Sequence, residues 1–308
     1  MEILTDGLRF PEGPVVLPNG DLAVVEIEAG QITRIKADGT KNIIAKVGGG
    51  PNGMAIGPDG YLYICNNGGF NFVEMETPLG KILFPHGQAD DYAGGSIQRV
   101  NPDSGEVQII YTQCNGRNLC GPNDIIFDEQ GGFWFTDHGK NDGASRKRDI
   151  VGVFYAKIDG SHIEEVIFPM ENPNGIGLSP DGKRLYVAET YTCALWAFDV
   201  VEPGKISPVA NLAGNGGHFL YRPEGYKYFD SLGVENEGNI CVATIGTSGI
   251  SVISPMGELV EFVPTLDPMT TNICWGGNDM RDAYICLSGT GKILKYKWPR
   301  AGLKLNFA

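Results

Sequence analysis

The stretch PNGIGLSPDGKRLYVAET, residues 173–190, decides the fold. After Pro173 comes a small polar residue, Asn174, and then a short apolar run, a P-D-G turn and a second apolar run. A P-D-G turn between two apolar runs is a strong hairpin signal. The stretch therefore predicts two short antiparallel strands.

The same pattern occurs six times along the chain. Each copy begins with a small polar or acidic residue and reaches a turn eight residues later, and the copies are Glu12–Gly20, Asn52–Gly60, Asn123–Gly131, Asn174–Gly182, Asp230–Gly238 and Thr271–Asp279. The apolar runs that follow the turns are LAVVE, YLYIC, FWFTD, RLYVAE, NICVA and DAYICLS. Repeats at an uneven spacing of roughly 40 to 70 residues are typical of propeller blades that carry insertions.

Two more strand-like runs per repeat would complete four-stranded blades, whose apolar faces are covered only by neighbouring blades. We therefore predict an all-β fold, a six-bladed β-propeller with four-stranded antiparallel blades around a central channel. A single domain over residues 1–308 suits an all-β chain of this length. The expected blades are approximately 12–50, 51–120, 121–171, 172–228, 229–269 and 270–308 plus 1–11, with residues 1–10 pairing with the last blade.

One long insertion, residues 66–95, interrupts the second repeat. Its glycines and aromatic residues fit a loop or lid over one face of the propeller, and an extended hairpin is the alternative.

The composition limits the partners. The net charge is −13 and no basic stretch stands out, so we expect no nucleic acid or membrane partner. No apolar run of about 18 residues occurs, and the first residues do not resemble a signal peptide, so we expect a cytoplasmic protein. The seven cysteines lack zinc spacing and are expected to be free thiols, with a Cys114–Cys120 bridge as the alternative. The sequence leaves the oligomeric state open.

The first residue of each repeat has the same structural address, at the start of the innermost strand. In a propeller these six addresses surround one end of the channel, and here they are Glu12, Asn52, Asn123, Asn174, Asp230 and Thr271. All six offer oxygen and none is His or Cys, which favours a hard cation such as Ca²⁺ over zinc or copper. Asn or Asp before a strand is an ordinary turn residue in any single repeat, but six in register predict a metal site. We expect Glu12, Asn123, Asn174 and Asp230 to bind the metal, while Asn52 and Thr271 line the pocket.

The chain resembles the SMP-30/gluconolactonase/luciferin-regenerating-enzyme-like family, which includes diisopropyl-fluorophosphatase-like propellers. The motifs that carry the resemblance are PEGP at Glu12, GPND and FWFTD around Asn123, residues 173–190, and DSLGVENEGNICVA from Asp230. The resemblance implies a catalytic Ca²⁺, which Zn²⁺, Mn²⁺ or Mg²⁺ can replace, held by those same four residues. It also implies hydrolysis of sugar-acid lactones or, in a few members, of organophosphates.

Two positions depart from the family pattern. Gly121 stands where animal members carry a substrate-binding Arg, which argues against a sugar lactone, and Arg117 and Asn118 lie nearby as substitutes. FTDHG, with His138, replaces the FTDPPYG of many microbial members.

The expected chemistry is metal-assisted opening of a lactone, a small-molecule cyclic ester, with Asp230 as general base or nucleophile. Asn52, Asn118, Asp124, His138 and Thr271 are the expected substrate-binding residues. His138 and His218 could shuttle protons or could be surface or loop anchors, and Glu189 could point into the channel or to solvent. The alternatives are a phosphotriesterase, a non-enzymatic calcium-binding propeller, or a strictosidine-synthase-like propeller.

Overall fold

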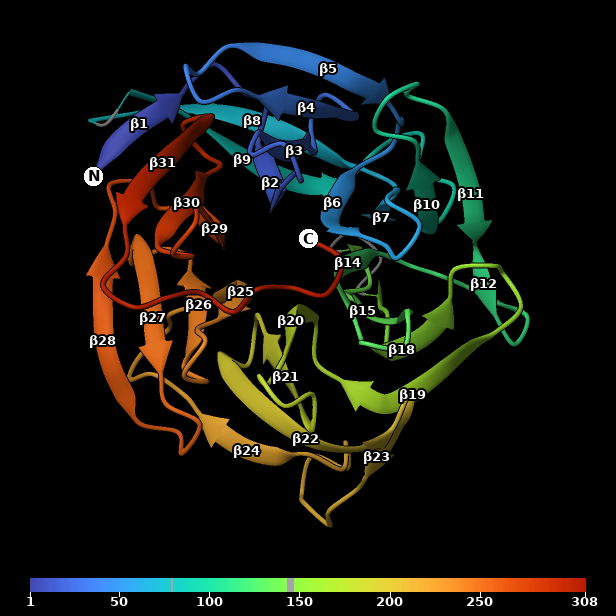
Figure 1. Ribbon diagram of the computed structural model, residues 1–308. Helices are drawn as coiled ribbons and strands as arrows, with labels where there is room; N and C mark the ends of the chain where they lie inside the picture. The colour runs from blue at the N-terminus through green and yellow to red at the C-terminus, as the bar shows by residue number, and fades with distance from the viewer. Residues whose placement is uncertain (79, 143–146) are drawn as a thin grey trace.

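The computed structural model describes residues 1–78, 80–142 and 147–308, and these residues form strands and turns without a helix. Six antiparallel sheets, five of four strands and one of four strands with a short fifth, surround a central channel (Figure 1). The predicted all-β, six-bladed propeller is therefore confirmed. The described residues contain no helix that is long and apolar enough to cross a membrane.

Every blade runs from an inner strand at the channel to an outer strand at the rim. The inner strands are β2 (Pro11–Val16), β6 (Pro51–Ile56), β14 (Pro122–Phe127), β20 (Pro173–Leu178), β25 (Phe229–Val234) and β29 (Thr270–Gly276). The second strands are β3 (Leu22–Glu26), β7 (Leu62–Asn66), β15 (Gly132–Asp137), β21 (Arg184–Glu189), β26 (Ile240–Thr244) and β30 (Asp282–Leu287). These twelve strands are the six hairpins that the repeat predicts.

The outer half of each blade follows the same plan. The third strands are β4 (Gln31–Ile35), β10 (Ser96–Val100), β18 (Val151–Lys157), β22 (Ala194–Glu202), β27 (Gly249–Ile253) and β31 (Lys292–Lys297). The outer strands are β5 (Lys41–Lys46), β11 (Val107–Tyr111), β19 (Ile163–Met170), β23 (Lys205–Ser207), β28 (Leu259–Pro264) and β1 (Glu2–Thr5). Outside this plan lie β12 (Gln113–Cys114), β13 (Arg117–Asn118), β16 (Asn141–Asp142), β17 (Lys147–Arg148) and β24 (His218–Tyr221), of which β24 pairs with β22.

The sixth blade joins the two ends of the chain. Its outer strand β1 pairs antiparallel with β31, with Glu2 opposite Lys295. The predicted pairing of residues 1–10 with the last blade is confirmed, and backbone hydrogen bonds close the propeller.

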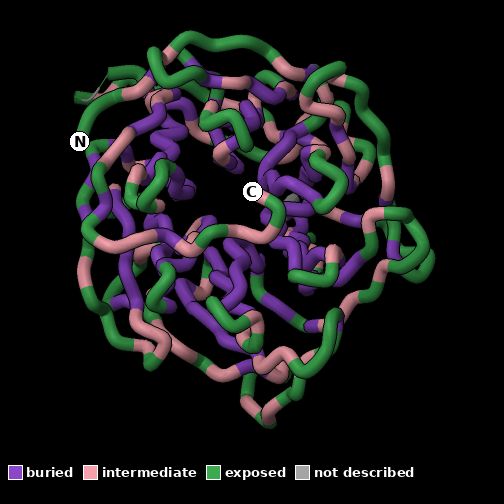
Figure 2. Tube along the Cα trace, viewed as in Figure 1, coloured by how far each residue is buried: buried purple, intermediate pink, exposed green. Residues whose placement is uncertain are grey.

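An apolar cluster fills each contact between neighbouring blades. Tyr63 of the second blade packs on Phe127 and Phe133 of the third, with ring centroids 5.1 and 5.8 Å apart. Trp134 lies between the third and fourth blades, and Trp275 between the fifth and sixth. Burying one such side chain stabilises the fold by about 1.5–3 kcal/mol. The buried inner strands and exposed outer strands are visible in Figure 2.

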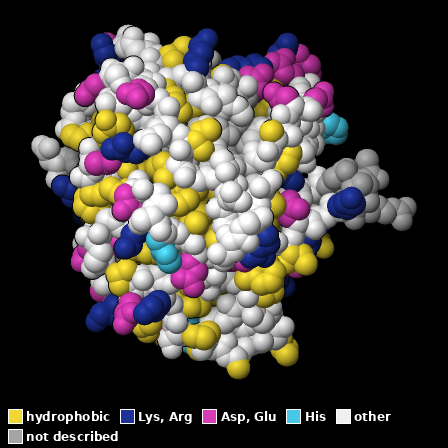
Figure 3. Space-filling view, turned by 90° about the vertical axis from the view of Figure 1, so that its right-hand side faces the viewer, with side chains coloured by type: hydrophobic (Ala, Val, Ile, Leu, Met, Phe, Trp, Pro, Cys, Tyr) yellow, Lys and Arg dark blue, Asp and Glu magenta, His cyan; other side chains and the backbone are white. Residues whose placement is uncertain are grey.

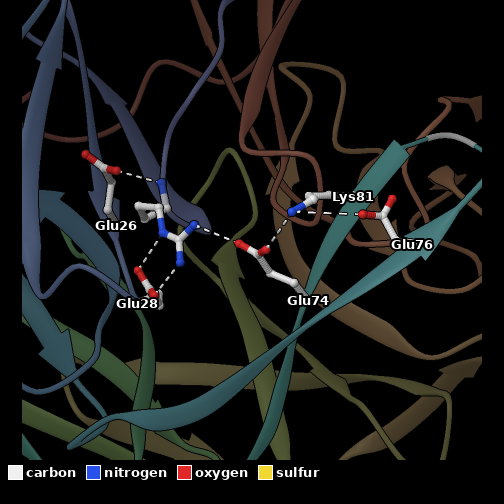
Figure 4. Close-up of polar contacts among 6 residues, drawn as sticks. Glu26, Glu28, Glu74, Glu76 and Lys81 are labelled. Atoms are coloured by element: carbon white, nitrogen blue, oxygen red, sulfur yellow. Dashed lines mark hydrogen bonds and ion pairs between the residues drawn. The ribbon is translucent and has the colours of Figure 1, made fainter.

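The insertion at residues 66–95 forms an extended hairpin, β8 (Phe70–Thr77) and β9 (Gly80–Gln88), with residue 79 outside the described residues. The hairpin packs where the inner strands begin, since Phe72 contacts Phe10 and the Leu83 N–H donates to the Gly289 carbonyl over 2.8 Å. Arg9 links it to the first blade by pairing with Glu74 (Figure 4). We call this end of the channel the upper mouth.

The residues after β31 cross the opposite end of the channel, which we call the lower mouth (Figure 1). The Leu303 N–H donates to the Val234 carbonyl over 2.9 Å, and the Asn306 side chain donates to the Phe127 carbonyl over 3.0 Å. Above this C-terminal tail lies a cavity of about 860 Å³, lined mainly by the inner strands and the tail.

The surface carries both signs of charge. On the side shown in Figure 3, Lys and Arg alternate with Asp, Glu and apolar side chains, and no broad basic patch is visible there. All seven cysteines are free, as predicted, including Cys114 and Cys120.

Candidate functional site

Six residues at the upper mouth form what we call the polar ring. They are the second residues of the six inner strands: Glu12, Asn52, Asn123, Asn174, Asp230 and Thr271. Each inner strand has a register irregularity next to its polar-ring residue, as between Glu12 and Val15 or between Phe229 and Leu232. A β-bulge re-aims a side chain and ends regular pairing. The same local distortion therefore occurs six times, at the positions that the repeat singled out.

Glycines let neighbouring inner strands approach one another beside the polar ring. A Cβ on Gly13 would lie 2.4 Å from the carbonyl oxygen of Asn52, and one on Gly53 would lie 2.5 Å from that of Asn123. Gly175 faces the Asp230 carbonyl in the same way, at 2.6 Å. Because any side chain would separate these backbones, glycine keeps the ring narrow.

Glu12 has one bonded and one unbonded carboxylate oxygen. Its Oε2 accepts hydrogen bonds from the Gly13 N–H over 2.6 Å and from the Asn272 side chain over 2.7 Å. Its Oε1 is buried and has no partner among the described residues. A buried acceptor without a partner is costly, so Oε1 is suited to receive a cation.

The amide side chains of Asn123 and Asn174 resemble Glu12 in having an oxygen with few or no hydrogen-bond partners among the described residues. The Asn123 Oδ1 is buried and without a partner among the described residues. Asn174 donates its Nδ2 to the Thr190 hydroxyl over 3.1 Å, which turns its Oδ1 toward Ser231 at 3.5 Å. The Asn174 donor is thus engaged with Thr190, and the Asn123 oxygen remains for a ligand.

Three carboxyl groups at this mouth have raised pKa values. Burial and then the Glu12 charge raise the pKa of Asp230 well above its ordinary value, and the same two causes raise the pKa of Asp124 to about 8. Burial also raises the pKa of Glu12. Like charges that gather in a desolvated site favour either protonation or a bound cation.

The acids alone do not make a metal cluster. Within residues 1–78, 80–142 and 147–308, no group of three or more His, Cys, Asp or Glu side chains is placed to hold one ion. The donor set has to combine Glu12 and Asp230 with the oxygens of Asn123 and Asn174. Carboxylate and amide oxygens together suit Ca²⁺, and the two unpartnered oxygens show that these residues fit such an ion.

The remaining polar-ring residues are buried and differ in their contacts. Asn52 is 6% exposed, at the start of β6. The Thr271 hydroxyl lies 2.5 Å from that of Ser288, which donates to the Pro11 carbonyl. Asp124 follows Asn123 and accepts from the Ile125 N–H over 2.9 Å and the Ile176 N–H over 3.4 Å, so it joins the third and fourth blades.

Sequence reasoning missed a second set of polar residues, at the ends of the second strands. The side chains of this set accept backbone N–H groups two or three residues before the polar ring: Glu26 from Arg9, Asn66 from Gly50, Asp137 from Gly121 and Glu189 from Glu171, over 2.6–3.0 Å. The signal was present, because the runs LAVVE, FWFTD and RLYVAE all end in an acid. These contacts hold the chain as it approaches each ring position. Glu189 thus points neither into the channel nor to solvent.

Asn272 and Ser231 were also missed. Each occupies the position after a polar-ring residue and contacts a ring side chain of a neighbouring blade. In three other blades this position is glycine, so only blade-by-blade alignment could have revealed their role.

The two histidines and Asn118 lie in different places. His138 is half-buried near the upper mouth, where burial lowers its pKa to about 4, and its ring centroid is 6.1 Å from that of Tyr191. Asn118 is exposed on β13, in a two-stranded sheet outside the blades. His218 lies on β24 with its Nε2 3.1 Å from Asp199, a surface contact on the fourth blade. The interpretation of His218 as an anchor fits this contact.

The fold and the site define a propeller with an oxygen-rich ring of buried side chains at one mouth of its channel. A sequence profile described as the SMP-30/Gluconolactonase/LRE-like region matches residues 10–289. The chain therefore belongs to this family.

Several proteins are similar to this chain over most of their length. A gluconolactonase of Zymomonas mobilis subsp. mobilis is 22% identical and aligns with 90% of this chain and 76% of its own. Diisopropyl-fluorophosphatase of Loligo vulgaris is 28% identical, over 82% of this chain and 78% of its own. The structure of a Xanthomonas campestris gluconolactonase superposes with a TM-score of 0.74 at 19% identity, covering 96% of this chain and 89% of its own, which shows the shared fold.

Proposed function

We propose that this protein is a calcium-dependent lactonase that opens a small cyclic ester to a hydroxy acid. The observation that carries the proposal is the polar ring, where oxygens of Glu12 and Asn123 have no partner among the described residues and the Glu12 charge helps to raise the pKa of Asp230. A purely structural ring would have its buried acceptors bonded.

The four residues proposed to hold the ion are Glu12, Asn123, Asn174 and Asp230. Together they supply two carboxylates and two amide oxygens, which balance a divalent charge. When bound, such an ion supplies Lewis-acid polarisation of an ester carbonyl. Asn272 holds Glu12 through Oε2 and leaves Oε1 to face the site.

Asp230 is the proposed base or nucleophile. It is half-buried, whereas the other five polar-ring residues are buried, so a substrate at the upper mouth can reach it. As a base, its carboxylate takes a proton from water while the water oxygen bonds to the carbonyl carbon. As a nucleophile, the carboxylate oxygen itself bonds to that carbon. In both cases the ester C–O bond breaks and the leaving oxygen takes up a proton to become the hydroxyl group. In the nucleophile route, water then hydrolyses the anhydride formed with Asp230, which gives the carboxyl group and frees Asp230.

Neighbouring residues would shape the substrate pocket. Asn52 and Thr271 complete the polar ring, and His138 lies on the third-blade side of the mouth. Asp124 is engaged with backbone N–H groups and would hold Asn123 in place. Asn118 was predicted to bind substrate and stays a prediction on an exposed strand outside the blades.

A lactone is favoured as substrate because the Zymomonas mobilis relative is named a gluconolactonase. An organophosphate is the second candidate, favoured by the similarity to diisopropyl-fluorophosphatase. The same residues would then act on a phosphoryl centre. Gly121 argues against a sugar-acid lactone in particular, since it offers no side chain to bind hydroxyl groups.

A pH-indicator assay tests the proposal with sugar-acid, aliphatic and aryl lactones and one organophosphate. It is run with Ca²⁺, with chelator, and with Asp230→Asn, and Asp199→Asn on the outer part of the fourth blade is the control. We expect lactone opening that chelator and Asp230→Asn abolish and Asp199→Asn preserves. Calcium binding without turnover of any compound would favour a non-enzymatic calcium-binding propeller, and failure to bind metal by calorimetry would refute the metal site.

A further inference from the structure

Four aromatic side chains line one side of the upper mouth, and we call them the aromatic wall: His138, Tyr191, Tyr226 and Tyr228. Their ring centroids are 6.1 Å apart for His138 and Tyr191, 5.9 Å for Tyr191 and Tyr228, and 6.2 Å for Tyr226 and Tyr228. Tyr191 is 46% exposed, Tyr228 37% and Tyr226 83%. Contiguous exposed aromatic side chains mark binding sites more often than isolated ones do.

The aromatic wall is tied to the polar ring by short connections. Tyr191 directly follows Thr190, whose hydroxyl accepts the Asn174 amide over 3.1 Å. Tyr228 comes two residues before Asp230, and its carbonyl accepts the Ile245 N–H over 2.8 Å.

The carbonyl of His138 is held in the same way. It accepts from the Asn172 side chain over 2.9 Å, two residues before Asn174. The wall therefore stands beside the third, fourth and fifth positions of the polar ring, on backbone segments that hydrogen bonds fix.

We propose that the aromatic wall binds a ring substituent of the substrate, and that the substrate class is an aryl-substituted lactone. This inference rests on the proposed lactonase function and adds to it the group that the substrate carries next to its ester. Aromatic side chains pair with another ring by offset stacking or edge-to-face contact, as Tyr191 and Tyr228 already do with an interplanar angle of 87°.

The polar groups around the wall favour an apolar occupant over a polyhydroxy one. Arg148 pairs with Glu171, which directly precedes Asn172 in the sequence. Thr192, which directly follows Tyr191, donates to Glu189 over 2.6 Å. A site for a sugar lactone needs several side chains that bond hydroxyl groups, and these two contacts engage polar side chains with the protein itself. The flat tyrosine faces remain as the recognition surface.

A matched pair of lactones tests the inference: γ-phenyl-γ-butyrolactone and unsubstituted γ-butyrolactone. In the double variant Tyr191→Ala/Tyr228→Ala we expect kcat/KM for the phenyl lactone to fall on the order of tenfold or more, through KM. The unsubstituted lactone should change little, and Tyr191→Phe/Tyr228→Phe should keep the wild-type preference. Phe307→Ala, which removes an exposed aromatic side chain at the lower mouth, is the control.

Binding measurements separate this inference from the proposed function. The phenyl lactone is titrated by calorimetry into Asp230→Asn, with and without the two tyrosine substitutions. If the two tyrosine substitutions abolish binding of the phenyl lactone, the proposed role of the aromatic wall is supported. This holds even if the wild-type protein hydrolyses neither lactone, because absence of hydrolysis would refute only the proposed lactonase function. The proposed role of the aromatic wall would be overturned if the double variant lost kcat/KM equally for both lactones, or if its binding and KM were unchanged.

Discussion

The two ends of the inner strands differ in hydrogen bonding and packing. At the upper end of β14, Asn123 is buried with an unpartnered oxygen beside a register irregularity. At the lower end of the same strand, Phe127 packs on Phe133 with centroids 5.4 Å apart, and its carbonyl accepts a hydrogen bond from Asn306. Four positions along one strand therefore separate a buried amide oxygen without a partner among the described residues from an apolar side chain packed on its neighbour.

This difference indicates which end of the inner strands contains interactions that destabilise the fold. Buried acceptors and neighbouring carboxylates each oppose folding, and proteins tolerate such features mainly where function needs them. The apolar clusters between blades, built around residues such as Tyr63 and Trp134, provide the stability that offsets them. Substitutions that remove these unfavourable polar groups at the upper end should therefore increase stability and abolish function.

Glu12→Gln should have the largest effect and should act in two directions. Replacing the Glu12 carboxylate, a proposed metal ligand, should weaken Ca²⁺ binding by more than about 100-fold, since changes to residues that only hold metal ligands in place cost about 10–100-fold. The metal-free variant should unfold at a temperature about 2 °C higher or more, because Gln can still accept from Gly13 and Asn272 without the buried charge. Titration calorimetry and scanning calorimetry in chelator measure both. A lower unfolding temperature would show that the Glu12 carboxylate stabilises the fold.

The pH dependence of the metal-free protein sharpens the comparison. The pKa of Asp124 is about 8 in the folded protein against an ordinary 3.8. Between these values the folded state holds the extra proton, so the free energy of unfolding falls as the pH rises, by up to about 1.4 kcal/mol per pH unit. Asp124→Asn should make urea-unfolding stability in chelator depend less steeply on pH between about 4 and 8. Equal slopes in the two proteins would contradict the proton's assignment to Asp124.

Two asparagines give the smallest effect and the most direct comparison of the two ends. Asn272→Ala removes the donor to Glu12 and should weaken Ca²⁺ binding by about 10–100-fold. Asn306→Ala removes the hydrogen bond to the Phe127 carbonyl and should cost about 1 kcal/mol of stability without changing Ca²⁺ affinity. Calorimetric titration and chemical unfolding of both variants measure this. If Asn306→Ala weakened Ca²⁺ binding as much as Asn272→Ala, the two ends would not be independent.

The repeat predicted the blades and the polar ring because both follow from local pattern. Six hairpin signals in register define six inner strands, and residues at the same point of each hairpin, such as Asn52 and Asn174, must lie around one axis. The irregularities that turn these side chains are not visible in the sequence, because they depend on backbone approaches such as that of Gly13 to Asn52.

Contacts that join distant segments were beyond the sequence. The hairpin β8–β9 packs on Phe10 and Gly289, and nothing local to residues 66–95 specifies those partners. The aromatic wall has the same origin, since Tyr191 and Tyr228 come from different blades and each looks like an ordinary loop residue alone. Loop positions are set by the scaffold, so composition predicts them poorly.

The seam between β1 and β31 also sets the order of events as the chain folds. Glu12 lies in the first blade and Asn272 in the last, 260 residues apart, and their bond spans the junction that the seam closes. Contacts at such separations form late, because the entropy of closing a long loop must be overcome first. During synthesis from the N-terminus, the Glu12 carboxylate has no such partner until β29 has been made, and the blade that carries β29 is complete only once β31 has paired with β1. Acquisition of Ca²⁺ affinity would therefore report on the final closure of the propeller rather than on the folding of any one blade.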